Sequence, residues 1–152
     1  MKNIYVISSP IINLYKKPSK RSEITSQIIY GESFQILKKT SKWLKIKILE
    51  DGYKGFIQKK NYINYIKPTH KIKKLKSSIF HFANPKIKKG ELSFGSKIKI
   101  TGKKSKFLKF NKGWINQNDV KPITFKEKDL FAKIKVFKNI KYKWGGKSFK
   151  GI

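Results

Sequence analysis

Apolar and polar residues alternate over short runs along most of the chain, a pattern typical of strands with one buried face. The two-residue period is clear at Phe34 and Ile36, and it returns at Leu44, Ile46 and Ile48. These runs predict strands, because successive side chains of a strand point to opposite faces of its sheet.

Clusters of turn-forming residues separate the predicted strands, at residues 39–42, 50–52 and 103–105. The pair Asp51-Gly52 is a strong hairpin signal, since Gly accepts the positive φ that a tight turn requires. About five short strands within roughly sixty residues predict a small β-barrel.

The chain contains an internal repeat. The matching segments are 30–37 with 94–100, 41–46 with 105–110, and 55–57 with 113–115. The offset is smaller for the last pair, because the first copy has an extra turn between Ile48 and Tyr53. Self-similarity of this kind predicts two homologous small domains.

After the second copy the period changes from that of a strand to that of a helix. Thr124 and Glu127 have the spacing of a capping box, which satisfies free amides of a first helical turn. Apolar residues then follow on one helical face, at Leu130, Ile134 and Phe137. The pattern predicts an α-helix of about four turns from about Lys126 to Lys138.

The composition is strongly basic, with 38 Lys and Arg against 8 Asp and Glu and a formal net charge of +30. Arg21 is the only arginine. Because specific readers of nucleic acid rely on the two-pronged contacts of Arg, the excess of Lys indicates diffuse attraction. We therefore expect no specific nucleic-acid partner, and we interpret most lysines as solvated.

The apolar content of 38% and aromatic content of 14% are enough for small packed cores. No stretch has the length of a membrane span or of a signal peptide, so we expect a cytoplasmic protein without a membrane partner. There is no cysteine, and His70 and His81 have no metal-ligand partner at a recognised spacing. We expect no metal and no cofactor.

The last eleven residues, 142–152, read Tyr-Lys-Trp-Gly-Gly-Lys-Ser-Phe-Lys-Gly-Ile. This segment resembles the approach to the nucleophile in the NlpC family of papain-like cell-wall peptidases. In that family the pattern Tyr-x-Trp-Gly-Gly-x-Ser-x-x-Gly runs into Asp-Cys-Ser-Gly, whose Cys attacks the peptide bond. We expect Gly145 and Gly146 to allow close backbone approach or a positive φ, and Trp144 to pack in a core.

Both copies of the repeat resemble bacterial SH3-like domains, with a Pro-containing loop near Pro18 or Pro85 and a Gly-aromatic-Ile strand. Two such domains before a catalytic domain resemble bacterial dipeptidyl-peptidase VI-like enzymes, which cleave γ-D-glutamyl bonds to diamino acids in murein peptides. The expected fold is mainly β: SH3-like domains at 1–65 and 70–123, then at 124–152 one α-helix that starts a truncated papain-like peptidase domain.

The resemblance also implies a substrate site. In that family the first SH3-like domain contributes an acidic residue and a tyrosine that bind the free amino end of the substrate. Tyr53 matches the tyrosine, Glu23 is the first candidate for the acid and Glu32 the second, and Tyr142 matches a substrate-contacting phenol. The alternatives are a hairpin aromatic for Tyr53, a solvated loop carboxylate for Glu23 and core packing for Tyr142.

Without Cys or a downstream His, the chain itself has no catalytic residue for this reaction. We expect it to be the substrate-gating portion of a longer murein-peptide γ-D-glutamyl-diamino acid endopeptidase, a cysteine peptidase. Its partners would then be murein-derived peptides with a free L-Ala amino end. The alternatives are a cell-wall-binding module and a non-specific nucleic-acid binder, and the oligomeric state is not predicted.

Overall fold

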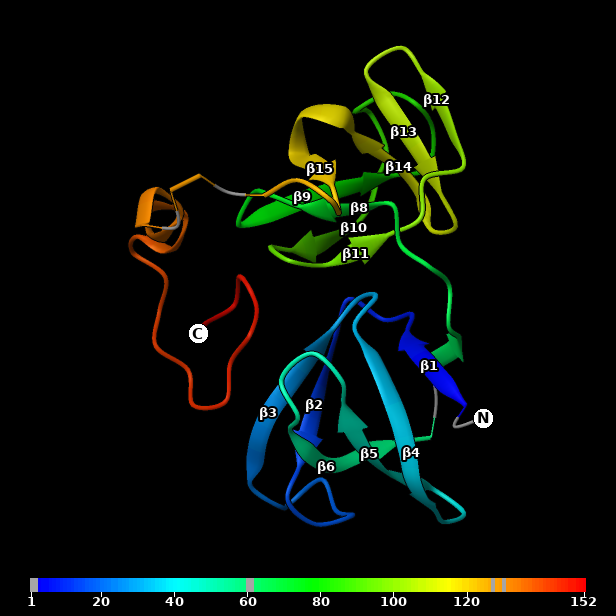
Figure 1. The fold of residues 1–152 in the computed structure, drawn as a ribbon, viewed down its shortest axis with the longest axis vertical. Helices are drawn as coiled ribbons and strands as arrows, with labels where there is room; N and C mark the ends of the chain where they lie inside the picture. Colours follow the sequence, from blue (N-terminus) through cyan, green and yellow to red (C-terminus); the bar gives the residue numbers. More distant parts are fainter. Residues whose placement is uncertain (1–2, 60–61, 127, 130) are drawn as a thin grey trace. The chain divides into compact units, whose positions relative to one another are not determined.

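The computed structural model consists of two compact units, which Figure 1 shows with their strands labelled. The first unit comprises Met1–Ile66 together with Lys141–Ile152, and the second comprises Lys67–Ile140. The structure describes residues 3–59, 62–126, 128–129 and 131–152.

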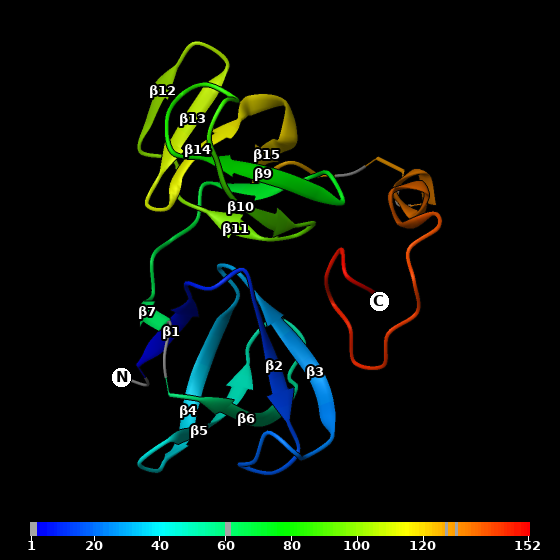
Figure 2. The same cartoon turned by 180° about the vertical axis from the view of Figure 1, so that it is seen from behind.

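The first unit is an antiparallel barrel of seven strands. The strands are β1 (Ile4–Ile7), β2 (Ile11–Tyr15), β3 (Ile24–Ile29), β4 (Ser33–Lys39), β5 (Trp43–Ile48), β6 (Lys54–Gln58) and β7 (Tyr62–Asn64). Their order in the sheet is β3-β2-β6-β5-β4-β1-β7. Figure 2 shows β7 beside β1, where its short ladder pairs Val6 with Ile63.

The second unit has the same kind of strands, divided between a sheet of five and a sheet of three. The elements are β8 (His70–Ile72), β9 (Lys76–Phe80), β10 (Lys88–Ser93), β11 (Lys97–Ile98), β12 (Gly102–Lys104), β13 (Phe107–Phe110), β14 (Gly113–Asn116), the 3₁₀ helix η1 (Gln117–Asp119), β15 (Val120–Pro122) and the 3₁₀ helix η2 (Phe131–Phe137). The sheet orders are β10-β9-β14-β13-β12 and β11-β8-β15.

The strand pairing confirms the internal repeat predicted from the sequence. In the first unit β1 lies between β4 and β7, and in the second unit β8 lies between β11 and β15. The two units differ where the long strand β4 of the first is replaced by β11 and β12 in the second. That interruption, at residues 99–101, divides the second sheet into two.

A tight turn recurs at the same place in both units. Gly31 has φ of 78° and Gly95 has φ of 81°, in the left-handed region that favours glycine. In the first unit the N–H of Ile7 donates to the carbonyl of Glu32, and in the second the N–H of Ile72 donates to that of Ser96. The turn therefore fixes β1 and β8 in equivalent positions.

Each barrel has its own apolar core. The first core consists of Ile7, Leu14, Ile28, Phe34, Leu44, Ile46, Ile48 and Ile57. The second unit buries residues at equivalent positions of its repeat: Ile72, Ile79, Leu92, Ile98, Phe110 and Ile115. The first core includes Phe34, Leu44, Ile46 and Ile48, whose alternation predicted strands, and the mainly β fold is confirmed.

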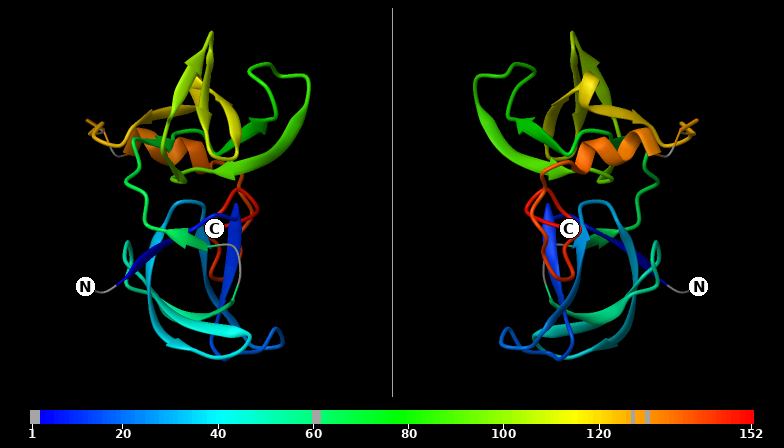
Figure 3. Two further views of the ribbon diagram at one scale, coloured as in Figure 1. Left: turned by 90° about the vertical axis from the view of Figure 1, so that its right-hand side faces the viewer. Right: turned by 90° about the vertical axis from the view of Figure 1, so that its left-hand side faces the viewer.

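The α-helix predicted from about Lys126 to Lys138 is wrong in type and length. The structure has instead η2, a 3₁₀ helix of seven residues, visible as the orange coil in Figure 3. Phe137 packs edge-on against Phe94 at 5.1 Å, but Ile134 is exposed. Glu127 and Leu130, two residues of the predicted cap and apolar stripe, lie outside the described residues. With Ile134 in solvent the stripe is incomplete, and short helices depend on such packing.

No helix in the described part of the chain is both long and apolar enough to cross a membrane.

Candidate functional site

The C-terminal segment, Lys141–Ile152, belongs to the first unit and lies along β3, as the red end of the ribbon shows in Figure 1. Gly145 has φ of 66°, and a Cβ there would stand 3.0 Å from the carbonyl carbon of Thr25 and 3.1 Å from the nitrogen of Ser26. A Cβ on Gly146 would collide with the carbonyl oxygen of Gly151. Both glycines are therefore required by close approach, as the sequence predicted.

Backbone hydrogen bonds close this segment on itself. The N–H of Lys143 donates to the carbonyl of Ile152 at 2.9 Å, and the N–H of Ile152 donates to that of Lys141 at 3.1 Å. A tight turn joins Ser148 and Gly151, and the Ser148 side chain is buried. The segment is thus a defined loop that docks on the barrel.

Lys147 joins the loop to the barrel by three polar contacts. Its ammonium donates to Glu32 Oε1 and to Asp51 Oδ2, each at 2.7 Å. Its backbone N–H donates to Gln27 Oε1 at 3.0 Å. The Gln27 amide is oriented in turn by Asn13, whose Oδ1 accepts from Gln27 Nε2 at 3.0 Å. We refer to Lys147, Glu32, Asp51 and Gln27 as the Lys147 clamp.

Burial and ion pairing act against each other in the Lys147 clamp. Burial raises the pKa of the Glu32 carboxyl, although the hydrogen bonds from Lys147 and from the Ile29 N–H lower it. Burial also lowers the pKa of Lys147, but the hydrogen bonds to Asp51 and Glu32 outweigh it, so that its pKa is raised. Lys147 therefore carries its charge at neutral pH, between two carboxylates.

Both acids of the Lys147 clamp occupy positions that differ between the two barrels. Glu32 follows the turn at Gly31, and the equivalent residue of the second barrel is Ser96, whose buried hydroxyl has no hydrogen-bond partner among the described residues. Asp51 lies on the loop 49–53 between β5 and β6, whereas residues 111–112 join the equivalent strands. The extra turn predicted in the first copy is confirmed, and it supplies half of the carboxylate pair.

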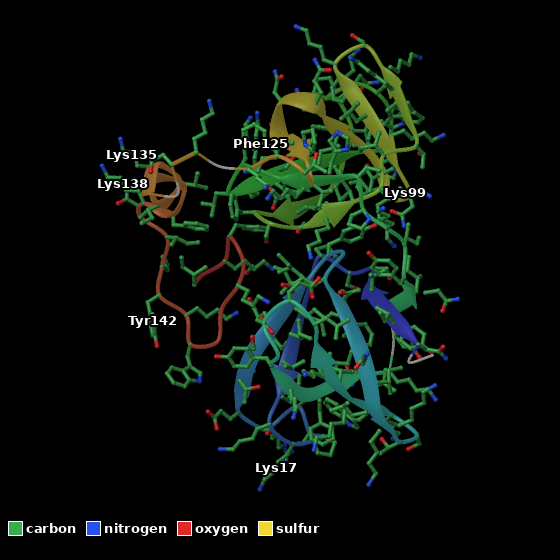
Figure 4. The ribbon with its side chains drawn as sticks, viewed as in Figure 1. Lys17, Lys99, Phe125, Lys135, Lys138 and Tyr142 are labelled. Carbon is green, nitrogen blue, oxygen red and sulfur yellow. The ribbon has the colours of Figure 1, made fainter. Side chains whose placement is uncertain are left out.

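Tyr53 and Tyr142, two of the predicted site residues, lie on the two sides of this contact. Tyr53 is 53% exposed and follows Asp51, whose Oδ1 accepts from the Tyr53 N–H at 3.0 Å. Tyr142 is 80% exposed, and Figure 4 shows its side chain directed away from the ribbon. The Lys147 clamp therefore joins the loop of Tyr53 to the segment of Tyr142.

The core-packing alternative for Tyr142 and the expected core position of Trp144 are both wrong, because Trp144 is 65% exposed as well. The segment is held by backbone contacts and by Lys147, which leaves its two aromatic rings directed outward.

Glu23 and Glu32, the two candidates for the amine-binding acid, have different surroundings. Glu23 ends the loop before β3 and accepts from Lys16 Nζ at 3.1 Å, in an exposed ion pair. It also lines a shallow basin with Lys17, Arg21 and neighbouring residues. Glu32 is buried and bonded to Lys147 and the Ile29 N–H. Glu23 thus keeps access to solvent, whereas Glu32 serves the docking of the loop.

Sequence reasoning missed Asp51, Gln27 and Lys147 as parts of the site. The sequence pattern assigns Asp51 only to a turn, although a carboxylate in a chain with 8 acids is a usable signal. Lys147 gave none, because it is one of many lysines. The described residues contain no group of three His, Asp or Glu side chains that could hold a metal ion.

The protein is a mainly β protein with two SH3-like barrels and a docked C-terminal loop. Comparisons with known proteins show which families have similar domains. Residues 14–61 match the family model described as the bacterial dipeptidyl-peptidase SH3 domain, which covers most of the first barrel. No curated protein matches the chain.

Among solved structures, an NlpC/P60 family protein from Bacillus cereus ATCC 10987 is similar over 98% of this chain and 68% of its own, with a TM-score of 0.77 and 16% identity. The NlpC2 protein from Trichomonas vaginalis covers 80% of this chain and 48% of its own, with a TM-score of 0.36 and 12% identity. The first likeness shows a shared fold, and the second is too weak to support an argument. The chain therefore contains a dipeptidyl-peptidase type SH3 domain within an arrangement shared with an NlpC/P60 family protein.

Proposed function

We propose that this chain is the substrate-gating portion of a murein-peptide γ-D-glutamyl-diamino acid endopeptidase, a cysteine peptidase, and that it acts in the cytoplasm. The Lys147 clamp carries this proposal. It fastens the barrel that matches the dipeptidyl-peptidase SH3 family to the segment that resembles the approach to a catalytic Cys. A gate of this kind has to be fixed relative to the reaction centre, because small displacements are costly in catalysis.

The gate would recognise a free L-Ala amino end. An ammonium group is bound well by a carboxylate and a phenol oxygen, since both accept its hydrogen bonds. Glu23 and Tyr53 supply these groups, each at the surface of the first barrel. Tyr142 would contact the substrate from the docked loop. A site built around an ammonium rejects longer or acylated peptides, because its polar groups would then be left unpaired.

Binding of the tripeptide L-Ala-γ-D-Glu-L-Lys to this chain, measured by calorimetry, tests the proposal. Tyr53→Phe or Glu23→Ala should weaken binding by roughly tenfold or more, since a charge-assisted hydrogen bond contributes about 1.5–3 kcal/mol. The same peptide with an acetylated amine should bind weakly to every variant. Tyr65→Phe, at another exposed tyrosine, and Glu91→Ala in the second barrel are matched controls that should leave binding unchanged.

Equal losses on the free and the acetylated peptide would show that these residues support the barrel and do not read the amino end. The gene provides an independent test of the peptidase assignment. The codons after Ile152 should encode Asp-Cys-Ser-Gly, and any sequence without this Cys would contradict the proposal.

A further inference from the structure

Each barrel carries the same arrangement of aromatic rings and a lysine on the outer side of its sheet. In the first barrel the rings of Tyr15 and Trp43 meet edge to face, with centroids 5.6 Å apart and an interplanar angle of 86°. Beside them the ammonium of Lys45 lies 5.8 Å from the centroid of Phe56.

The second barrel repeats this geometry with different ring types. Phe80 and Phe107 meet edge to face at 5.8 Å and 89°. The ammonium of Lys109 lies 5.8 Å from the centroid of Trp114. Tyr15, Trp43 and Phe56 thus have aromatic counterparts in Phe80, Phe107 and Trp114, at equivalent positions of the repeat.

The strand register places these side chains on one face. In the first barrel Phe56 pairs with both Tyr15 and Lys45, and Trp43 pairs with Gln58. In the second, Trp114 pairs with both Phe80 and Lys109, and Phe107 pairs with Asn116. The residues that alternate with them, such as Leu44, Ile57 and Ile115, are buried.

The two aromatic–lysine faces are Tyr15, Trp43, Lys45, Phe56 and Gln58 in the first barrel, and Phe80, Phe107, Lys109, Trp114 and Asn116 in the second. Their aromatic and amide side chains are half-buried, and Lys45 and Lys109 are exposed. Cross-strand packing accounts for aromatic pairs. It does not call for a lysine and a side-chain amide at the same place in both barrels, and this combination points to a ligand.

We propose that the two aromatic–lysine faces bind an acidic polysaccharide, a chain of sugar rings that carry carboxylate groups. The aromatic rings offer flat apolar surface to the C–H groups of a sugar ring. The ammonium groups attract the carboxylates, and the amides both donate to and accept from hydroxyls. A net charge of +30 adds long-range attraction for a polyanion.

Two observations favour this ligand over others. The faces and nearly the whole basic excess use Lys in place of Arg, whereas Arg is the side chain suited to the two-pronged contacts of phosphate and base recognition. Two pockets among the described residues of the first barrel, of about 490 and 470 Å³, are lined by other residues. An open sheet face suits an extended polymer better than an enclosed small molecule. This binding does not depend on the peptidase proposal.

Oligogalacturonate, with one carboxylate on each sugar ring, is the probe for a binding titration with the 152-residue chain. The double variant Lys45→Ala/Lys109→Ala should weaken binding by about tenfold, since charge-assisted hydrogen bonds contribute roughly 1.5 kcal/mol or more. The matched control is Lys17→Ala/Lys99→Ala, which removes one exposed lysine from each barrel outside the faces; Figure 4 labels both residues. It should weaken binding by no more than about twofold, because screened surface charges contribute little.

Ring variants test the apolar part of the faces. Trp43→Leu/Phe107→Leu keeps apolar bulk in the sheet and should still weaken oligogalacturonate binding, with folding checked by thermal unfolding. Neutral dextran and polyglutamate should bind more weakly than oligogalacturonate, because one lacks charge and the other lacks rings. Equal losses in both lysine pairs, or polyglutamate binding as tightly as the sugar, would overturn the proposal. Tighter binding of oligo-dT would identify the faces as a nucleic-acid surface instead.

Discussion

Lys147 lies between the buried carboxylate of Glu32 and the partly exposed carboxylate of Asp51. The free-energy cost of burying a charge is therefore larger for Glu32 than for Asp51. Burial raises the pKa of the Glu32 carboxyl, and the hydrogen bonds from Lys147 and from the Ile29 N–H favour its charged form. The side chain of Asp51 is more exposed, so water also solvates its carboxylate. Removing Lys147 would therefore leave the buried Glu32 carboxyl with the Ile29 N–H as its remaining donor among the described residues.

Lys147→Met should destabilise the first unit by about 1.5–3 kcal/mol, because a charged hydrogen-bond partner of a buried group is lost. Urea unfolding at pH 7 measures this change. Adding Glu32→Gln should recover part of the loss, since the orphaned charge is then gone. Lys16→Met, in the exposed pair with Glu23, is the control and should cost less than about 1 kcal/mol. Equal costs for the two lysines would contradict a buried clamp.

Glu91 gives the second unit a pH dependence in the acid range. The hydrogen bond from Lys88, at 2.5 Å, and the pairing with Lys76 hold the pKa of Glu91 below its ordinary value of 4.5. A lowered pKa contributes stability above pH 4.5 that is lost as the pH falls through the folded-state pKa.

The unfolding free energy of the native chain should exceed that of Glu91→Gln by about 0.5–1 kcal/mol at pH 7 and converge with it near pH 3. Denaturant titrations at several pH values measure this difference. A gap that persists unchanged at pH 3 would show that Glu91 acts by packing and not by charge.

At the scale of elements, the two barrels show how loop length changes the use of one scaffold. The loop 49–53 brings Asp51 to Lys147, and the two-residue connection 111–112 of the second barrel has no residue for such a role. Gly113, just after that short connection, has φ of 141°, and a Cβ there would meet the carbonyl oxygen of Phe80. A Cβ on Gly55, the equivalent residue of the first barrel, would likewise meet Leu14 and Tyr15, so the close approach of the two strands requires glycine in both barrels.

Gly113→Ala should destabilise the second unit by about 2–4 kcal/mol, from backbone strain together with a steric clash. Gly90→Ala, on β10 of the same unit, is the matched control because no atom lies within 4 Å of its added Cβ. It should change stability by less than about 1 kcal/mol and in the stabilising direction. Thermal unfolding of the two variants measures the difference, and similar melting temperatures would refute the clash.

At the scale of the whole molecule, the C-terminal loop belongs to the first unit although the second unit lies between them in the sequence. The loop covers part of the first barrel, where it lies along β3 and where its Lys147 bonds Gln27, Glu32 and Asp51. The core of the second unit is made from its own residues. The stability of the first barrel should thus depend on residues 141–152.

A chain that ends at Ile140 should lose hydrogen-exchange protection in β3 and keep it in β10. The expected loss is about 1–3 kcal/mol in the first unit, the range for removing partners of buried polar groups. Hydrogen exchange followed by mass spectrometry on peptides from the two strands measures both units in one experiment. Equal losses in β3 and β10 would contradict the assignment of the loop to the first unit.

The sequence by itself determined the strands, the repeat and the glycine requirement of the C-terminal loop. Alternation at Leu44, Ile46 and Ile48 and the turn at Asp51-Gly52 are local signals, set by side-chain periodicity and by backbone sterics. The repeat added a second copy of the same signals. The resemblance singles out Gly145 and Gly146, and close contacts give each a physical reason: Gly145 lies against Thr25 and Ser26 of β3, and Gly146 lies against Gly151 of its own loop.

Only the tertiary structure decided which charges act together and which apolar residues are buried. Lys147 meets Glu32 and Asp51 across 115 and 96 residues of sequence, and one lysine among many carries no local mark of such a contact. The apolar periodicity predicted an α-helix, but the side chain of Ile134 is exposed to solvent. A short helix is stable only where its apolar face packs against other residues. The aromatic–lysine faces likewise arise from strand register, which joins residues far apart in the chain.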